Sequence, residues 1–190
     1  LMGQSASVHS ISPTYSGKTI HTSIAWNPFI TVYEFSGSLV CSEEGEFEQL
    51  IPLSSPRVVL FETGIYQAYL YMEPGYHYEL ILPDYVERKW DQQISPFYEP
   101  VSLPLSVRSR TSLSTGELID GSQDVNHSIA RFDSLFAIAN RKIIVNRRDG
   151  QNSSIDSLIQ QLEISFESDS SSFFTDYRRF RYGILNLNEG

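Results

Sequence analysis

The side chains that could do chemistry in this chain are few and lie far apart. Its four histidines, His9, His21, His77 and His127, fall in separate segments, and none has a second histidine or a cysteine at the spacing of a zinc site. Cys41 is the single cysteine, which excludes an intrachain disulfide and a C-x-x-C redox pair. The sequence contains no G-x-S-x-G motif, no Walker loop and no dinucleotide-binding glycine motif. We therefore expect no catalytic residue, no metal and no cofactor.

Acidic residues gather in two short segments that could attract a cation. Residues 43–46 (EEGE) form an acidic turn, which is more typical of a solvated hairpin tip than of a calcium site. Residues 120–124 alternate oxygen ligands as an EF-hand loop does, but the glycine is out of place and the twelfth position is Arg131. Neither segment therefore predicts calcium binding. A carboxylate pair for glycoside hydrolysis stays open, because two such groups need only converge in space.

Two groups of residues are candidates for a partner surface. One is a set of tyrosines that could stack on a sugar, although tyrosines flanked by Leu and Ile more often pack in a core: Tyr66, Tyr69, Tyr71, Tyr76 and Tyr78. The other is a set of arginines that could dock the acidic first half or an anionic partner, although such residues more often lie on a solvated helix face: Arg178, Arg179 and Arg181. Both sets point to a protein or a glycan as the partner.

The charge of the chain restricts the choice of partner. The 190 residues carry a formal net charge of −9. Residues 1–104 hold 4 Lys and Arg against 12 Asp and Glu, a net charge of −8, whereas residues 105–190 hold 10 against 11, a net charge of −1. Nucleic-acid binding needs clustered cations, so it is not expected. No window approaches the roughly 20 apolar residues of a membrane span, and the oligomeric state stays open.

The segment at the centre of the expected fold is residues 58–83, VVLFETGIYQAYLYMEPGYHYELILP. Apolar and polar residues alternate on both sides of Pro74–Gly75, which predicts two antiparallel strands joined by a type II turn. In that hairpin Tyr71 faces Tyr78 and Tyr69 faces Leu80. Both faces of the hairpin are apolar, so we expect a cover on each side. For the face that carries Tyr66, Leu70, Met72 and Ile81, we expect the cover to come from elements of the same chain, with the C-terminal helices as the main candidate.

The whole chain reads as an α+β protein, an antiparallel β-sandwich of about seven strands followed by a C-terminal helical hairpin or small bundle. Residues 18–82 carry turn signals every 8 to 12 residues and include a second predicted hairpin, 38–50. Prolines exclude a regular helix in residues 83–104, where Trp90, Phe97 and Tyr98 suggest a connector packed on the sandwich. From Asp124 the apolar period becomes that of a helix, with further helices capped at Ser153 or Ser154 and opening at 171–172.

These features divide the chain into three parts. Residues 1–14 form an N-terminal tail, residues 15–104 the β-sandwich with its proline-rich connector, and residues 105–190 the helical region. In the tail, Ser5–Ala6–Ser7 supplies the small residues of a signal-peptidase site, which favours export, and a frayed end is the alternative. Cys41 lies in the alternating run 39–41, so we expect a buried, unreactive thiol.

Short motifs in both halves add a resemblance. Residues 44–47 (EGEF), 64–71 (GIYQAYLY), 73–75 (EPG) and 78–80 (YEL) with Pro83 resemble the N-terminal β-domain of secreted Bacteroidetes proteins. That group includes the domain of unknown function that precedes thioredoxin-like domains in envelope thiol-disulfide oxidoreductases. Residues 130–135 (ARFDSL) and 173–177 (FFTDY) with Arg181–Tyr182 resemble the helical region of a related uncharacterised group.

The resemblance implies a β-sandwich followed by helices, and export to the periplasm, the outer-membrane surface or the medium. It carries over no catalytic residue, because the redox cysteine pair of the oxidoreductases has no counterpart in this sequence. We therefore expect a non-catalytic secreted or cell-envelope module that binds a protein or glycan. The alternative is an N-terminal accessory domain of a thiol-disulfide oxidoreductase whose thioredoxin-like domain lies outside this chain, and a structural spacer is the third reading.

Overall fold

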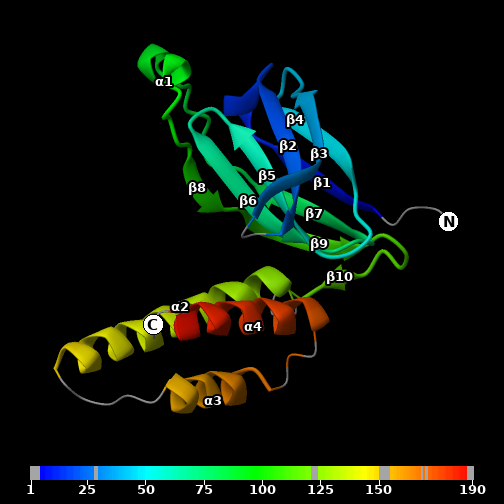
Figure 1. The fold of residues 1–190 in the computed structure, drawn as a ribbon. Helices are drawn as coiled ribbons and strands as arrows, with labels where there is room; N and C mark the ends of the chain where they lie inside the picture. The colour runs from blue at the N-terminus through cyan, green and yellow to red at the C-terminus, as the bar shows by residue number, and fades with distance from the viewer. Residues whose placement is uncertain are drawn as a thin grey trace. The chain divides into compact units, whose positions relative to one another are not determined.

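The computed structural model describes residues 5–27, 30–120, 124–149, 155–167, 169 and 171–187. Its internal contacts divide the chain into two compact units, Leu1–Gly121 and Ser122–Gly190 (Figure 1). The first unit is built from strands and the second from helices, so the expected α+β class is confirmed. The sequence had placed the boundary between residues 104 and 105, whereas the contacts place it between 121 and 122.

The described residues of the first unit form ten strands in two sheets of five. Sheet A has the order β10-β9-β7-β1-β4, with the bounds β10 Leu118–Ile119, β9 Ser106–Ser112, β7 Tyr76–Ile81, β1 Ser5–Ile11 and β4 Glu46–Pro52. Sheet B has the order β3-β2-β5-β6-β8, with the bounds β3 Ile30–Val40, β2 Thr19–Asn27, β5 Arg57–Thr63, β6 Tyr66–Met72 and β8 Val101–Pro104. A short 3-10 helix, η1 Pro13–Tyr15, precedes β2. The helix α1 Trp90–Ile94 lies between β7 and β8, so the expectation that prolines exclude a helix from residues 83–104 is wrong: the five helical residues fit between Pro83 and Pro96.

Both sheets are mixed, so the expected antiparallel sandwich of about seven strands is wrong in detail. β1 runs parallel to β7, and β6 runs parallel to β8, while the other pairs are antiparallel. β3 continues through Ser36 and Gly37, although serine and glycine are typical turn residues. The hairpin 38–50 is also wrong, because β3 belongs to sheet B and β4 to sheet A.

The largest difference from the expected fold concerns the hairpin predicted at residues 58–83. β6 and β7 lie in different sheets, and Pro74–Gly75 turns the chain from one sheet to the other. Tyr71 therefore pairs with Val58 of β5 and not with Tyr78. Alternation on both sides of a turn fits either a hairpin or a connection between two sheets, since both give each strand one apolar face.

The two sheets share one hydrophobic core. Sheet B contributes Ala68, Leu70 and Met72 of β6, and sheet A contributes Tyr78 and Leu80 of β7. Leu70 and Met72, which are 1% and 0% exposed, face this core. They therefore need no cover from the helices, which corrects the expectation from the sequence.

β1 occupies a central place in sheet A, between β7 and β4. Its inward residues Ala6 and Val8 are both 0% exposed. Residues 5–11 are thus part of the folded core, although the sequence had placed them in an N-terminal tail. The same holds for residues 106–119, which form β9 and β10 although they were expected in the helical region.

The second unit consists of α2 Val125–Arg148, α3 Ile155–Ser165 and α4 Ser172–Leu187, which contact one another. The Oδ1 atom of Asp124 accepts the Asn126 amide at 2.7 Å, as expected for the cap of α2. The expected cap of α3, Ser153 or Ser154, lies outside the described residues. The ring of Phe132, 0% exposed, lies within 6.0 Å of five aromatic rings, those of Phe136, Phe166, Phe174, Tyr177 and Tyr182. The helices therefore form a small bundle around an aromatic core.

Candidate functional site

A network of histidine, glutamate and serine side chains lies on the outer face of sheet A. Strand pairing aligns outward-facing residues of β4, β1, β7 and β9 in two neighbouring rows. The rows are Leu50, Ser7, His77 and Thr111, and Glu48, His9, Glu79 and Ser109. We call this area, together with Glu46, the network surface. The alternate residues of the same strands, such as Val8 on β1 and Tyr78 on β7, point into the core.

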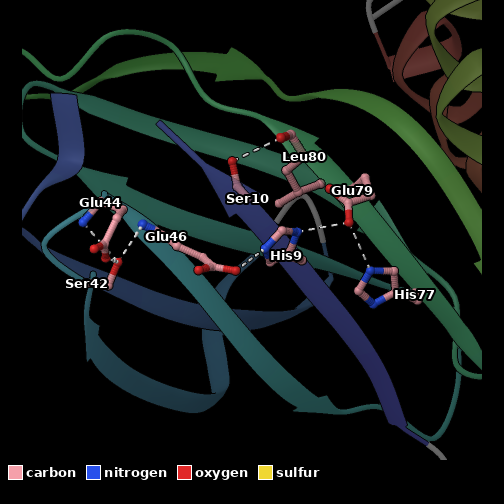
Figure 2. A network of polar contacts seen from close by, with 8 residues as sticks. All are labelled: His9, Ser10, Ser42, Glu44, Glu46, His77, Glu79 and Leu80. Atoms are coloured by element: carbon pink, nitrogen blue, oxygen red, sulfur yellow. Dashed lines mark hydrogen bonds and ion pairs between the residues drawn. The ribbon is translucent and has the colours of Figure 1, made fainter. Parts of the chain in front are cut away.

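His9 is the centre of the network (Figure 2). Its Nε2 atom lies 2.8 Å from Glu46 Oε1, and its Nδ1 atom lies 2.9 Å from Glu79 Oε1. An ionised carboxylate only accepts hydrogen bonds, so the imidazolium form of His9, in which both ring nitrogens donate, satisfies both contacts at once. In that form the network holds a cation between two carboxylates.

His77 continues the network on the neighbouring strand. Its Nδ1 atom lies 2.7 Å from Ser7 Oγ, and its Nε2 atom lies 3.4 Å from Glu79 Oε1. The rings of His77 and His9 are stacked, with centroids 6.4 Å apart. The Glu79 carboxylate thus accepts from both imidazoles (Figure 2).

The environment shifts the pKa of two of these groups. The hydrogen bond to Glu46 raises the pKa of His9, partial burial opposes this, and Glu79 adds to the increase. Partial burial alone would raise the pKa of Glu79, but hydrogen bonds from His9 and His77 outweigh it and lower that pKa. Both shifts favour the charged pair over the neutral one.

The acidic turn 43–46 positions Glu46 for this contact. Ser42 Oγ accepts the amides of Glu44 and Glu46, each at 3.2 Å, and donates to Glu44 Oε2 at 3.0 Å (Figure 2). Gly45 has a φ of +76°, and a Cβ atom there would lie 1.9 Å from the Ser12 carbonyl oxygen. Only glycine fits this turn. The turn therefore orients a carboxylate of the network as well as joining two strands.

Ser7, His77 and Glu79 also form a Ser-His-acid series, which raises the question of nucleophilic catalysis. Ser7 lies on β1, whose backbone pairs with β4 on one side and with β7 on the other. An oxyanion hole needs unpaired amides beside the nucleophile, and a central strand supplies none. The Ser7–His77 contact follows from their direct pairing across the two strands. Strand pairing alone therefore accounts for this series, and the paired backbone of β1 supplies no oxyanion hole beside Ser7.

The site does not match the geometry of a metal centre. Within the described ranges, no group of three or more His, Cys, Asp or Glu side chains is arranged to hold a metal ion. Each imidazole nitrogen of His9 is engaged with a carboxylate, so neither has a free lone pair for a metal.

The five candidate tyrosines do not form one platform. Tyr66, Tyr69 and Tyr71 belong to sheet B, whereas Tyr76 and Tyr78 belong to sheet A. Tyr78 is 0% exposed and its hydroxyl accepts the Glu73 amide at 2.9 Å. Tyr71 is buried, and the other three are half-buried. Core packing, the alternative weighed for these residues, describes Tyr78 best.

The three candidate arginines also separate. Arg178 is buried, and its guanidinium lies 5.0 Å from the Phe174 ring centroid and 3.2 Å from Glu163 Oε1. Arg181 pairs with Asp133 at 3.4 Å. Arg179 is exposed and lies 3.7 Å from Asp176, one turn away. Arg179 is thus the member of this set that fits a solvated helix face.

The sequence had predicted that Cys41 is buried, and this is confirmed. Cys41 is 3% exposed and belongs to the core between the sheets. Burial raises the pKa of its thiol, so the reactive thiolate is disfavoured. Its lack of reactivity stays a prediction.

Sequence reasoning missed the network surface. Two patterns in the sequence could have indicated it, because Ser7 and His9, and likewise His77 and Glu79, are two residues apart and thus share one strand face. The parallel pairing of β1 with β7 brings these pairs together across about 70 residues, and no local pattern predicts it.

Comparison with family models, curated proteins and solved structures found no significant match to this chain. The resemblance to secreted Bacteroidetes proteins therefore stays a prediction. None of the helices in the described part of the chain combines the length and the apolar character needed to cross a membrane.

Proposed function

We propose that this chain is a non-catalytic binding module and that the network surface contacts a partner protein. The observation that supports the proposal is an ordered His-Glu network on a sheet face with exposed apolar side chains around it. Leu50 is 65% exposed, Ile11 is 52% exposed and Ile81 is 46% exposed. They lie next to the network on β4, β1 and β7.

A polar centre with apolar neighbours favours a protein over a glycan as the partner. The two rows of the network surface contain no Trp, Tyr or Phe, whereas sugar binding relies on stacking against such rings together with hydrogen bonds. Protein interfaces combine exposed aliphatic side chains with a few fixed polar groups. The network already satisfies its own charges, so its groups are held in place before a partner binds.

The charge of the surface defines the chemistry of the partner. The network surface holds three carboxylates, Glu46, Glu48 and Glu79, beside the imidazoles of His9 and His77. The surface is therefore acidic, as is the first half of the chain. A partner segment with Lys or Arg next to apolar residues would complement it.

A random peptide library displayed on phage tests this proposal. The whole chain is immobilised at pH 6, and the affinity of each selected peptide is measured by fluorescence anisotropy. We expect peptides rich in Lys and Arg whose affinity falls at least about fivefold with Leu50→Ser or Glu79→Gln. The matched control is Val40→Ser, since Val40 is 69% exposed but lies on β3 of sheet B.

Two results would overturn the proposal. One is a selection that yields no peptide, or peptides that bind all three variants as tightly as the unmodified chain. The other is a carbohydrate on a glycan array whose binding is abolished by Leu50→Ser, which would replace the protein partner by a glycan.

We extend the proposal to location and infer an envelope or secreted protein. The support is the resemblance to exported proteins and the low lysine content, with 3 lysines in 190 residues. Fractionation of cells that express the complete reading frame tests this part, and recovery of the protein in the cytosol alone would contradict it.

A further inference from the structure

The connector between β7 and β8 carries the most exposed aromatic residues in the described part of the first unit. Trp90 is 74% exposed, Phe97 is 90% exposed and Ile94 is 58% exposed. Figure 1 shows α1, which contains Trp90 and Ile94, projecting beyond the strands. We call residues 87–100 the connector knob. The sequence had predicted that this connector packs on the sandwich, and for Trp90 and Phe97 this is wrong.

The knob is clamped at its base by one residue of the turn between β5 and β6. The Ile65 amide donates to the Val86 carbonyl oxygen at 2.9 Å, and the Ile65 carbonyl oxygen accepts the Val101 amide at 2.9 Å. The Tyr98 hydroxyl donates to the same carbonyl oxygen at 3.2 Å. Both ends of the knob therefore meet at Ile65, so the segment is a closed loop and not a free linker.

A second set of contacts fixes the side of the knob that faces the turn. Arg88 Nε donates to the Gly64 carbonyl oxygen at 2.7 Å, and the guanidinium lies 5.1 Å from the Tyr98 ring centroid. Arg88 also lies 3.9 Å from Glu62 Oε2. Gly64 has a φ of +55°, and a Cβ atom there would lie 2.0 Å from the Val86 carbonyl oxygen. The turn and the knob thus approach too closely for any residue with a side chain.

The short helix at the tip is held by its own side chains. Gln92 Oε1 accepts the Lys89 amide at 2.9 Å, and Gln93 Nε2 donates to the Arg88 carbonyl oxygen at 2.8 Å. A helix of five residues is not stable by itself, so these bonds and the clamp maintain its shape. The apolar side chains are consequently presented in a fixed arrangement.

Rigid presentation of exposed apolar residues is the arrangement of a binding surface. Large exposed apolar patches are unusual on soluble monomers, and aromatic anchors dominate the energetics of protein interfaces. A surface ordered in advance loses less entropy on binding. A connector that served only to join two strands would need none of these exposed aromatic residues.

We propose that the connector knob inserts Trp90 and Phe97 into an apolar pocket of a partner protein, and that Lys or Arg residues rim that pocket. The exposed charged residues of the knob are Glu87, Asp91 and Glu99 against the single Lys89, because Arg88 is engaged at the base. The acidic residues of the knob are repelled by anionic lipid headgroups and are complementary to a basic protein surface. The site is independent of the network surface, which lies on sheet A.

Photo-crosslinking tests the proposal with the whole chain. Benzoylphenylalanine replaces Phe97 in one variant, Trp90 in a second, and Val40 in a control that is 69% exposed on β3. We expect one protein to be crosslinked at both knob positions and not at the control, through an apolar segment flanked by Lys or Arg. With that partner purified, Trp90→Ala should weaken binding at least about tenfold, while Val40→Ala should leave it unchanged.

Four results would overturn the proposal. They are the absence of any adduct at the knob, adducts to lipid, adducts to a second copy of this chain, and adducts shared with the control. Because Trp90 and Phe97 are exposed, their variants should keep the melting temperature of the unmodified chain. A variant that is folded but binds as before would therefore count against the knob.

Discussion

Apolar side chains have opposite environments in the strands β6 and β7 and in the connector knob. Leu70 and Tyr78 are 1% and 0% exposed, whereas Trp90 and Phe97 are 74% and 90% exposed. In the strands, each apolar side chain meets the facing sheet across the core. The knob is fixed only at its base, around Ile65. Apolar composition alone therefore does not predict burial, which requires a second layer opposite the side chain.

The largest expected effect distinguishes the two regions by stability. Leu70→Ala removes side-chain atoms from the core and should lower the free energy of unfolding by roughly 2–5 kcal/mol. Trp90→Ala removes a larger side chain but should change it by no more than about 0.5 kcal/mol, because most of that side chain is exposed. Urea denaturation measures both values. A large loss with Trp90→Ala would show that the knob packs on the first unit.

A glycine substitution tests the clamp. Gly64→Ala combines a positive φ with a Cβ atom 2.0 Å from the Val86 carbonyl oxygen, so we expect a loss of roughly 2–3 kcal/mol. The matched control is Gly116→Ala, where φ is +72° but nothing lies within 4 Å. The control should lose only the backbone term, about 1–2 kcal/mol. Equal losses would mean that the knob does not press on this turn.

The network surface should make stability depend on pH. The pKa of His9 is raised from 6.5, so its contribution is complete below pH 6.5 and is lost as the pH rises through the folded-state pKa. The pKa of Glu79 is lowered from 4.5, so its contribution is complete above pH 4.5 and is lost as the pH falls through its folded-state pKa. Both contributions are present between pH 4.5 and 6.5.

His9→Ala should therefore cost roughly 0.5–1 kcal/mol at pH 5.5 and less at pH 8. Thermal denaturation across the pH range, compared with His21→Ala, measures the difference. His21 is exposed on β2 of sheet B and lies away from this network. A cost for His9→Ala that does not change with pH would contradict the proposed charge on His9.

The smallest expected effect is the change in stability caused by Phe97→Ala in the knob. Phe97→Ala should change the free energy of unfolding by no more than about 0.5 kcal/mol, as ordinary surface substitutions do. The same variant should weaken binding to the crosslinked partner. Loss of binding without loss of stability separates a contact residue from a structural one, and circular dichroism with calorimetry checks the stability.

Local patterns in the sequence predicted the helices better than the sheets. Helical period and capping located α2 and α4, because contacts within a helix join residues three or four positions apart. The segments of β4, β6 and β7 were also predicted as strands, but their partners were not. Alternation determines which face a residue occupies, but it does not determine which strand lies beside it.

The candidate site depended on the part that could not be predicted. His9 meets Glu79 because β1 and β7 pair in parallel, and Glu46 meets His9 because β4 returns to β1. The same limit applies to the knob, where Ile65 joins two ends of a connector. The aromatic residues of the connector suggested that it packs on the sandwich. Their exposure depends on whether another element lies opposite them, which the sequence does not show.

The central claim is that the connector knob is ordered and yet exposes its aromatic residues. Amide hydrogen exchange of the whole chain, followed by NMR, tests this claim most directly. It measures how stable the hydrogen bonds at the base of the knob are, and it needs no partner protein. We expect the amides of Ile65 and Val101 to exchange as slowly as those inside β6, since each donates to a backbone carbonyl at the base of the knob. Exchange of both amides at the rate of an unstructured peptide would contradict the claim and would make the connector a flexible linker.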